Sequence, residues 1–177
     1  NEDSQARVIG DEPFQIKNKF SDIRVAVDEN RCHGIEQLLQ LKDPEVDVIL
    51  LDDAFRHRYV EAGINILLTD YNRLFCEDKL LPAGRLRESR KGKNRAQIVI
   101  VTKCPADIKP IDFKIISKQL DLFPFQKLYF STFQYGKLTP VFKNLEQTER
   151  ALSSIQADEQ ILLLTGIASP LTLVNEL

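Results

Sequence analysis

An acidic pair that follows an apolar run has the residue types and the placement to hold a metal ion beside a phosphate. The run is Val46–Leu51; Asp52 and Asp53 come directly after it, and His57 follows within about one turn. Open α/β sheets bind ligands at the carboxyl ends of their strands, and carboxylate oxygens are ligands that Mg²⁺ prefers. A structural alternative is that one Asp caps the next helix, because Asp is a favoured N-cap residue.

A second acidic pair, Asp11 and Glu12, lies between Gly10 and Pro13. The flanking glycine and proline predict a loop. If this loop meets Asp52 in space, one carboxylate can coordinate Mg²⁺ while another takes a proton from an attacking hydroxyl group. A solvated turn explains the same four residues, so the functional interpretation depends on a shared location.

A strongly basic segment lies further along the chain. Six Arg and Lys residues and a single acid occur between Arg85 and Arg95. The preceding Pro82–Gly84 predicts a fixed loop that presents Arg85 and Arg87, and guanidinium groups bind phosphates through paired hydrogen bonds. A basic segment also favours anionic membrane surfaces. For residues 90–95 a solvated helix face is an equally good explanation.

Three more positions lie where predicted strands end. Arg31 follows the strand expected over residues 23–27, which places it on the ligand-binding side of a parallel sheet. Thr102 and Lys103 end another predicted strand, at a point where a Thr-Lys pair contacts the nucleotide base in G-protein-like P-loop folds. That match is only two residues long and is weak by itself.

Strands that alternate with helices are expected to position these side chains. Apolar segments of β-type composition predict five strands, Ile23–Val27, Val46–Leu51, Ile64–Thr69, Ile98–Thr102 and Ile161–Thr165. Helical spacing of apolar residues predicts helices over Asn30–Leu41 and Asp112–Leu122. This alternation predicts an α/β fold with a mostly parallel sheet. The aromatic segment Lys127–Phe142, with its Tyr-Gly-Lys turn, predicts a small β-hairpin or edge pair.

The composition, 43% hydrophobic and 28% charged with a net charge of -2, is typical of a soluble globular protein. Three widely spaced cysteines without a C-x-x-C motif indicate neither a zinc site nor a disulfide framework, and they fit a cytoplasmic protein. No apolar run reaches the roughly 18 residues that span a bilayer. Because the chain begins with Asn and contains no Met, we expect residues 1–177 to be one domain truncated at both ends.

Taken together, these motifs resemble the tetraacyldisaccharide 4'-kinase (lipid A 4'-kinase) family of Gram-negative bacteria. The motifs keep their order over almost the whole chain: GDEP at Gly10–Pro13, ENR at Glu29–Arg31, LDDAFRHR at Leu51–Arg58, LLPAGRLRE at Leu80–Glu88, VTKCP at Val101–Pro105 and GIASP at Gly166–Pro170. The two longest motifs, LDDxFxHR and LPAGRLRE, are specific in combination, whereas TKCP and GIASP would not be specific alone.

The resemblance implies a P-loop NTPase-like α/β kinase that moves the γ-phosphate of ATP, with Mg²⁺, onto the 4'-hydroxyl of a tetraacyldisaccharide 1-phosphate. It also implies contact with the membrane surface, at the cytoplasmic face of the bacterial inner membrane. The implied site residues are Asp11 and His57 for catalysis, Asp53, Thr102 and Lys103 for the nucleotide, Asp52 and Glu12 for the metal, and Arg31, Arg85 and Arg87 for the anionic lipid.

The chain also departs from the family pattern. It contains no G-x-x-x-x-G-K-[ST] loop, which the family carries upstream together with a membrane anchor, so we expect the segment to be inactive alone. Ala54, Arg56 and Ser89 stand where the family more often has Gly, Gln and Pro.

Two other functions remain open. A metal-dependent phosphodiesterase or nuclease would use both acidic pairs, and an anionic-lipid-binding module would need no catalysis. The basic segment lacks the interleaved aromatic residues of a single-strand platform, so we expect no nucleic-acid partner.

Overall fold

The computed structural model describes residues 6–43, 45–140, 149–156, 158–165 and 171–174. In chain order the elements are α1 (Ala6–Ile9), α2 (Asp11–Lys19), α3 (Arg31–Leu39), β1 (Ile66–Asp70), the 3-10 helix η1 (Arg90–Arg95), β2 (Ile98–Thr102), α4 (Pro110–Leu120), β3 (Lys127–Phe130), η2 (Leu152–Ser154) and α5 (Leu171–Val174). Within these ranges no helix has the length and apolar character needed to cross a lipid bilayer.

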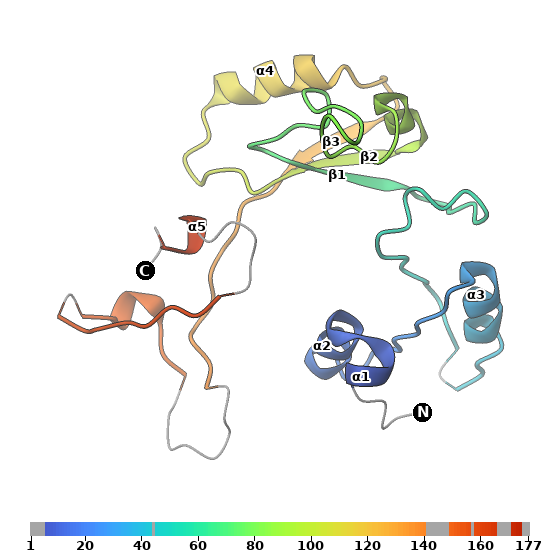
Figure 1. The fold of residues 1–177 in the computed structure, drawn as a ribbon, viewed down its shortest axis with the longest axis horizontal. Helices are drawn as coiled ribbons and strands as arrows, with labels where there is room; N and C mark the ends of the chain where they lie inside the picture. Colours follow the sequence, from blue (N-terminus) through green and yellow to red (C-terminus); the bar gives the residue numbers. More distant parts are fainter. Residues whose placement is uncertain (1–5, 44, 141–148, 157, 166–170, 175–177) are drawn as a thin grey trace.

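The three strands form one parallel sheet in the order β1-β2-β3, which confirms the predicted α/β class. Ile66 pairs with Ile98, and Ile98 pairs with Lys127 on its other side. Figure 1 shows α4, which connects β2 to β3, lying along one face of this sheet. The helix starts with Pro110 because proline tolerates the first helical position, and the Asp112 carboxylate accepts a hydrogen bond from the Lys109 backbone N–H at 3.2 Å.

The core lies between the sheet and α4. Alternate residues of a strand face opposite sides, so Val99 and Val101 point toward α4 and are fully buried against Ile116 and Leu120. On the opposite face Leu68 of β1 is exposed. Partly buried aromatic residues pack against the edge of this core from outside the sheet, Phe55 and Phe75 among them.

Two of the five predicted strands are confirmed. Residues 98–102 form β2, and the strand expected over 64–69 is present as β1, shifted by two residues at its start. The segments 23–27, 46–51 and 161–165 belong to no strand, so those three predictions are wrong. An apolar run becomes a strand only where a neighbour pairs its backbone and covers its side chains. Val48 is 73% exposed and Leu50 is 89% exposed, so this cover is missing.

The two predicted helices are confirmed and are present as α3 and α4. The predicted hairpin and the predicted loop around Asp11 need correction. The hairpin over residues 127–142 is wrong, because β3 ends at Phe130 and pairs in parallel with β2; residues 141 and 142 lie outside the described ranges. The loop predicted around Asp11 and Glu12 is wrong as well, because both acids lie in the first turn of α2. Gly10 precedes this helix at φ 93°, a conformation that favours glycine. The GIASP turn, residues 166–170, also lies outside the described ranges.

Candidate active site

An open pocket of about 550 Å³ brings acidic and basic side chains together. Five residues predicted from the sequence are among those that line it, Glu12, Asp52, Asp53, Arg85 and Arg87. The acids come from the first turn of α2 and from the turn after residue 51, and the arginines come from the loop before η1. The shared location that the two acidic pairs required is therefore present for Glu12, while the neighbouring Asp11 is not part of the pocket lining.

A tight turn presents Asp52 and Asp53. The Asp52 carboxylate accepts a hydrogen bond from the Asp53 backbone N–H at 2.9 Å, and Asp53 has a left-handed backbone with φ 43°. Directly after it, the His57 N–H donates to the Ala54 carbonyl at 2.8 Å and closes a second turn over residues 54–57. A left-handed backbone is strained for most residues, but the short side chain of Asp tolerates it. Such strain commonly marks functional turns.

Arg87 contacts one of the two acids of this turn. Its Nη1 lies 3.4 Å from Asp53 Oδ2, and the two side chains are 56% and 77% exposed. An exposed ion pair at this distance contributes little to stability because water screens it. The guanidinium group of Arg87 therefore lies beside the acids in a weak ion pair. An incoming anionic group can replace Asp53 as its partner.

A second group of contacts fastens the acidic turn to the folded core. Arg95 Nη2 donates to the Phe55 carbonyl at 2.9 Å and to the two carboxylate oxygens of Glu88 at 2.8 and 3.1 Å. The Arg95 guanidinium also lies 4.7 Å from the centre of the Phe55 ring. Arg58 approaches Glu88 at 3.8 Å. Because Phe55 is two residues after Asp53, these contacts restrict where the acids can lie.

Sequence reasoning missed Phe55, Glu88 and Arg95 as parts of the site. One signal could have pointed to Glu88, since it is the single acid in a segment with six basic residues. No local pattern connects Phe55 with Arg95, which are 40 positions apart.

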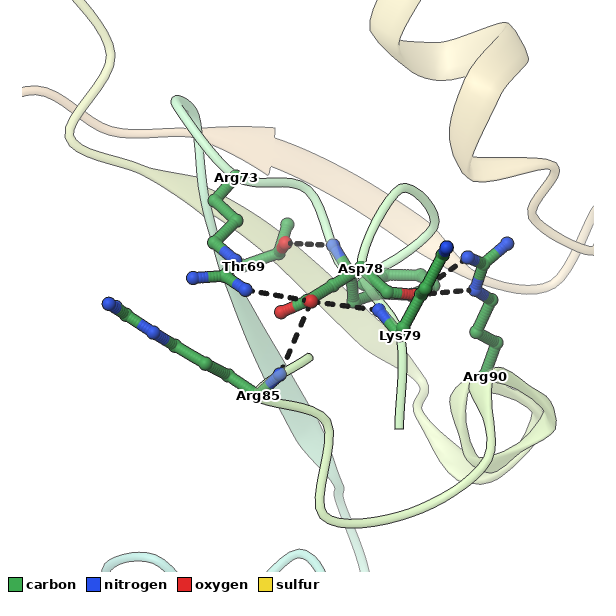
Figure 2. A network of polar contacts seen from close by, with 7 residues as sticks. Thr69, Arg73, Asp78, Lys79, Arg85 and Arg90 are labelled. Atoms are coloured by element: carbon green, nitrogen blue, oxygen red, sulfur yellow. Dashed lines mark hydrogen bonds and ion pairs between the residues drawn. The ribbon is translucent and has the colours of Figure 1, made fainter. Parts of the chain in front are cut away.

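The loop between β1 and η1 is organised around one carboxylate. Figure 2 shows Asp78 with Arg73, Arg85 and Arg90 around it. Asp78 Oδ1 accepts hydrogen bonds from Arg73 Nη2 at 2.8 Å, from the Lys79 N–H at 2.8 Å and from the Arg85 N–H at 3.3 Å. The hydrogen bond from Arg73 is the main cause that lowers the pKa of Asp78 from 3.8 to about 2.

Four other predicted site residues lie outside the pocket lining. At the carboxyl ends of β1 and β2, Lys103 Nζ lies 2.6 Å from Asp70 Oδ2, and Thr102 Oγ1 donates to a main-chain carbonyl of β1 at 3.3 Å. Arg31 begins α3 and donates to the Asp28 carbonyl at 3.1 Å. The fourth is His57, whose exposed side chain belongs to the acidic turn. The roles of all four stay predictions.

The acids of the pocket suit a magnesium ion that shares its coordination sphere with phosphate. In the part of the chain that the structure describes, no three His, Cys, Asp or Glu side chains converge to form a metal cage. Mg²⁺ does not need one, because it is usually bound through one or two carboxylates together with water and substrate phosphates. Asp52 and Asp53, with Glu12 on the same pocket, provide donors of this chemical type.

A family model described as tetraacyldisaccharide-1-P 4'-kinase matches residues 1–177. The chain belongs to this kinase family. Its parallel α/β sheet agrees with the P-loop type of fold that membership implies.

Relatives that carry the name tetraacyldisaccharide 4'-kinase support the assignment. The sequence is 72% identical over 176 residues to a protein of Bacteroides fragilis (strain YCH46), covering 99% of this chain and 47% of that protein. It is 62% identical over 180 residues to a relative from Bacteroides thetaiotaomicron, at 98% and 47% coverage, and 46% identical over 178 residues to one from Porphyromonas gingivalis (strain ATCC 33277), at 99% and 48%. The chain thus spans about half the length of these curated relatives. No solved structure gives a significant match.

Changing Arg95 to Lys is expected to loosen the attachment of the acidic turn to the core. Lys keeps the positive charge but loses the flat guanidinium group that lies over the Phe55 ring and whose Nη2 donates to both the Phe55 carbonyl and Glu88. We expect the free energy of unfolding to fall by about 2 kcal/mol, the sum of an exposed cation–π contact of about 0.5 kcal/mol and one charged hydrogen bond of about 1.5 kcal/mol. The measurement is denaturant unfolding of a full-length chimera, in which residues 1–177 replace the matching segment of the Bacteroides fragilis relative.

Arg58→Lys is the matched control, because Arg58 is exposed and lies 3.8 Å from Glu88. It should change the stability by less than about 0.5 kcal/mol, as surface substitutions usually do. Equal effects of Arg95→Lys and Arg58→Lys would contradict an anchoring role for Arg95.

The lowered pKa of Asp78 predicts how its contribution to stability depends on pH. A carboxyl whose pKa falls from 3.8 to about 2 on folding stabilises the fold above pH 4, and this stabilisation disappears as the pH falls toward 2. Asp78→Asn removes the charge at every pH. We therefore expect the difference in Tm between the unaltered chimera and this variant to be largest above pH 4 and to close toward pH 2. A difference that stays constant from pH 2 to 6 would exclude the ion pair as its cause.

Proposed function

We propose that the full-length protein carrying this segment is an ATP-dependent tetraacyldisaccharide 4'-kinase of lipid A biosynthesis. It would transfer the γ-phosphate of ATP to the 4'-hydroxyl of a tetraacyldisaccharide 1-phosphate. The observation that carries the proposal is a pocket that joins acids and arginines, Glu12, Asp52, Asp53, Arg85 and Arg87, in a chain of this kinase family. Phosphoryl transfer relies mainly on positioning and charge neutralisation, which these residue types supply.

The acids divide into three proposed roles. Asp52 and Glu12 would provide the carboxylates for Mg²⁺, which when bound neutralises charge on the transferring phosphate, and Asp53 would face the nucleotide. Asp11 would act as the general base, one position before Glu12 in the first turn of α2. As the 4'-oxygen bonds to the γ-phosphorus and the bond to the bridging oxygen of ADP breaks, the hydroxyl proton passes to the Asp11 carboxylate. His57, which lies outside the pocket lining, would help to hold the segment that follows Asp52 and Asp53, where its N–H donates to the Ala54 carbonyl.

The basic side chains serve the two anionic ligands in this proposal. Arg85 and Arg87 would bind the phosphate or sugar of the lipid through paired hydrogen bonds, and Arg31 would assist them. Thr102 and Lys103 would contact the nucleotide, for which Lys103 has to exchange its present partner, Asp70. The basic segment that follows would face an anionic membrane, at the cytoplasmic surface of the inner membrane.

The arrangement of the acids is less suitable for a nuclease with two metal ions. Such an enzyme places its ions about 3.5–4 Å apart and needs several carboxylates to converge on both. Asp11 is outside the pocket lining, and in the described ranges no group of three carboxylate or imidazole ligands is present.

The test is transfer of labelled phosphate from ATP to a tetraacyldisaccharide 1-phosphate by the full-length chimera. A 4'-phosphorylated lipid that depends on Mg²⁺ and is lost in Asp11→Ala supports the proposal. If the folded chimera binds ATP but forms no labelled lipid while the unaltered relative does, the proposed activity is wrong for this segment.

A further inference from the structure

The carboxylate of Asp78 is nearly buried, but Asp78 does not line the pocket. Its side chain is 9% exposed, and the residue is not part of the pocket lining. It therefore does not contact a ligand bound among the acids and arginines. A carboxylate withdrawn from water needs partners that replace its hydration, and these partners indicate what it holds in place.

The main-chain partners of Asp78 lie at both ends of a short loop. One carboxylate oxygen accepts from the Lys79 N–H at 2.8 Å and from the Arg85 N–H at 3.3 Å. The same loop is closed by hydrogen bonds from the Leu86 N–H to the Lys79 carbonyl at 3.0 Å and from the Leu81 N–H to the Leu86 carbonyl at 2.9 Å. The carboxylate thus brings together main-chain atoms six positions apart.

Two arginines connect this loop to regular structure. Arg73, whose N–H donates to the Asp70 carbonyl at the end of β1, also donates its Nη2 to Asp78 Oδ1 at 2.8 Å. Arg90, the first residue of η1, donates Nε and Nη2 to the Asp78 carbonyl at 3.0 and 2.6 Å. These contacts hold Asp78 between the end of β1 and η1. They therefore fix the position of the loop relative to both elements.

Arg85 itself uses only its backbone in this network. Figure 2 shows its side chain extending away from the Asp78 carboxylate, and the residue lines the pocket together with Arg87. We propose that Asp78 is a positioning residue that sets where Arg85 and Arg87 present their guanidinium groups to the phosphate of the anionic substrate. This inference rests on the proposed kinase function, in which the two arginines bind that substrate.

The test compares Asp78→Ala with two other variants of the full-length chimera. Asp78→Asn keeps an oxygen that can accept the two main-chain N–H groups, so it should rescue most of the effect. Glu77→Gln is the matched control, because Glu77 is the adjacent carboxylate and accepts a hydrogen bond from Gln119 of α4 at 3.1 Å. The readouts are hydrogen exchange of the loop amides and the separate KM values for ATP and for tetraacyldisaccharide 1-phosphate.

We expect Asp78→Ala to raise the KM for the lipid about tenfold, which corresponds to the loss of one good interaction, with kcat and the KM for ATP changed less than about twofold. The amides of Arg85 and Leu86 should exchange at least about tenfold faster. In an Arg85→Ala background the same change should add little to the KM, because its effect passes through Arg85. Glu77→Gln should alter none of these values.

Two results would overturn the inference while leaving the kinase function intact: unchanged exchange of the loop amides in Asp78→Ala, or full additivity with Arg85→Ala. Absence of phosphoryl transfer in the unaltered chimera would instead overturn the proposed function. Hydrogen exchange does not depend on activity, so the two failures are distinguishable.

Discussion

Replacing Asp52 by Asn in the full-length chimera is expected to reduce the rate of phosphoryl transfer about 10³-fold. Asn preserves the size of the side chain but removes the negative charge that a magnesium ion requires. Charge stabilisation by a bound metal ion is worth several kcal/mol, and each 1.36 kcal/mol corresponds to a factor of ten in rate. The measurement is the initial rate at saturating ATP over a range of Mg²⁺ concentrations.

The Mg²⁺ series separates a metal ligand from a residue that only shapes the turn. Loss of a ligand weakens the ion, so a higher Mg²⁺ concentration should recover part of the rate in Asp52→Asn. Asp47→Asn is the matched control, because Asp47 is exposed in the same chain segment and lies outside the pocket lining. It should leave the rate within about twofold. A rate in Asp52→Asn that is reduced less than about tenfold would remove Asp52 from the metal site.

Replacing Gly84 by Ala is expected to disrupt the closed loop of residues 79–86. A Cβ atom at this position would lie 2.2 Å from the Lys79 carbonyl oxygen and 2.5 Å from Asp78 Oδ1. Both distances are far below van der Waals contact, and the first atom belongs to the backbone, so it cannot move away without opening the loop. We expect the free energy of unfolding to fall by about 3 kcal/mol, at the upper end of the usual cost of overpacking. Denaturant unfolding of the chimera measures this change.

The same substitution has a functional consequence, because Gly84 immediately precedes Arg85. A displaced loop moves the guanidinium groups of Arg85 and Arg87, so the KM for the lipid should rise more than the KM for ATP. Gly63→Ala provides a closely matched control, since a Cβ there has no atom within 4 Å. It should change stability by less than about 0.5 kcal/mol. If Gly84→Ala is as stable as Gly63→Ala, the loop around Asp78 has room for a Cβ atom at position 84, and the description of its tight packing is wrong.

Local patterns in the sequence predicted those elements that local interactions stabilise. Helical spacing located α3 and α4, and capping explains their starts. The Asn30 side chain accepts hydrogen bonds from the Cys32 and His33 N–H groups, and Pro110 opens α4. The apolar run of β2 was predicted with its observed bounds because that strand is paired on both sides, as the sequence-based interpretation assumed. Residue type and motif order alone also indicated the kinase family and five of the residues that line the pocket, Glu12, Asp52, Asp53, Arg85 and Arg87.

Tertiary structure decided which apolar runs are strands and which charged residues meet. Residues 46–51 have the composition of a strand, yet they are unpaired with any strand of the described chain, because pairing depends on neighbours rather than on composition. At the start of α2, Glu12 lines the pocket and Asp11 does not. The sequence cannot show which of two adjacent acids faces a pocket.

Several contacts that hold the site together join residues far apart in the sequence. No local sequence pattern therefore predicts them. Arg95 reaches Phe55 across 40 positions, and Arg87 reaches Asp53 across 34. Two of the partners of the Asp78 carboxylate are main-chain N–H groups, which every residue except proline carries, so no residue type marks these two partners. The sequence alone therefore determined which chemical groups the pocket can offer, carboxylates and guanidinium groups. Its three-dimensional arrangement came from ion pairs and backbone hydrogen bonds that exist only once distant segments are folded together.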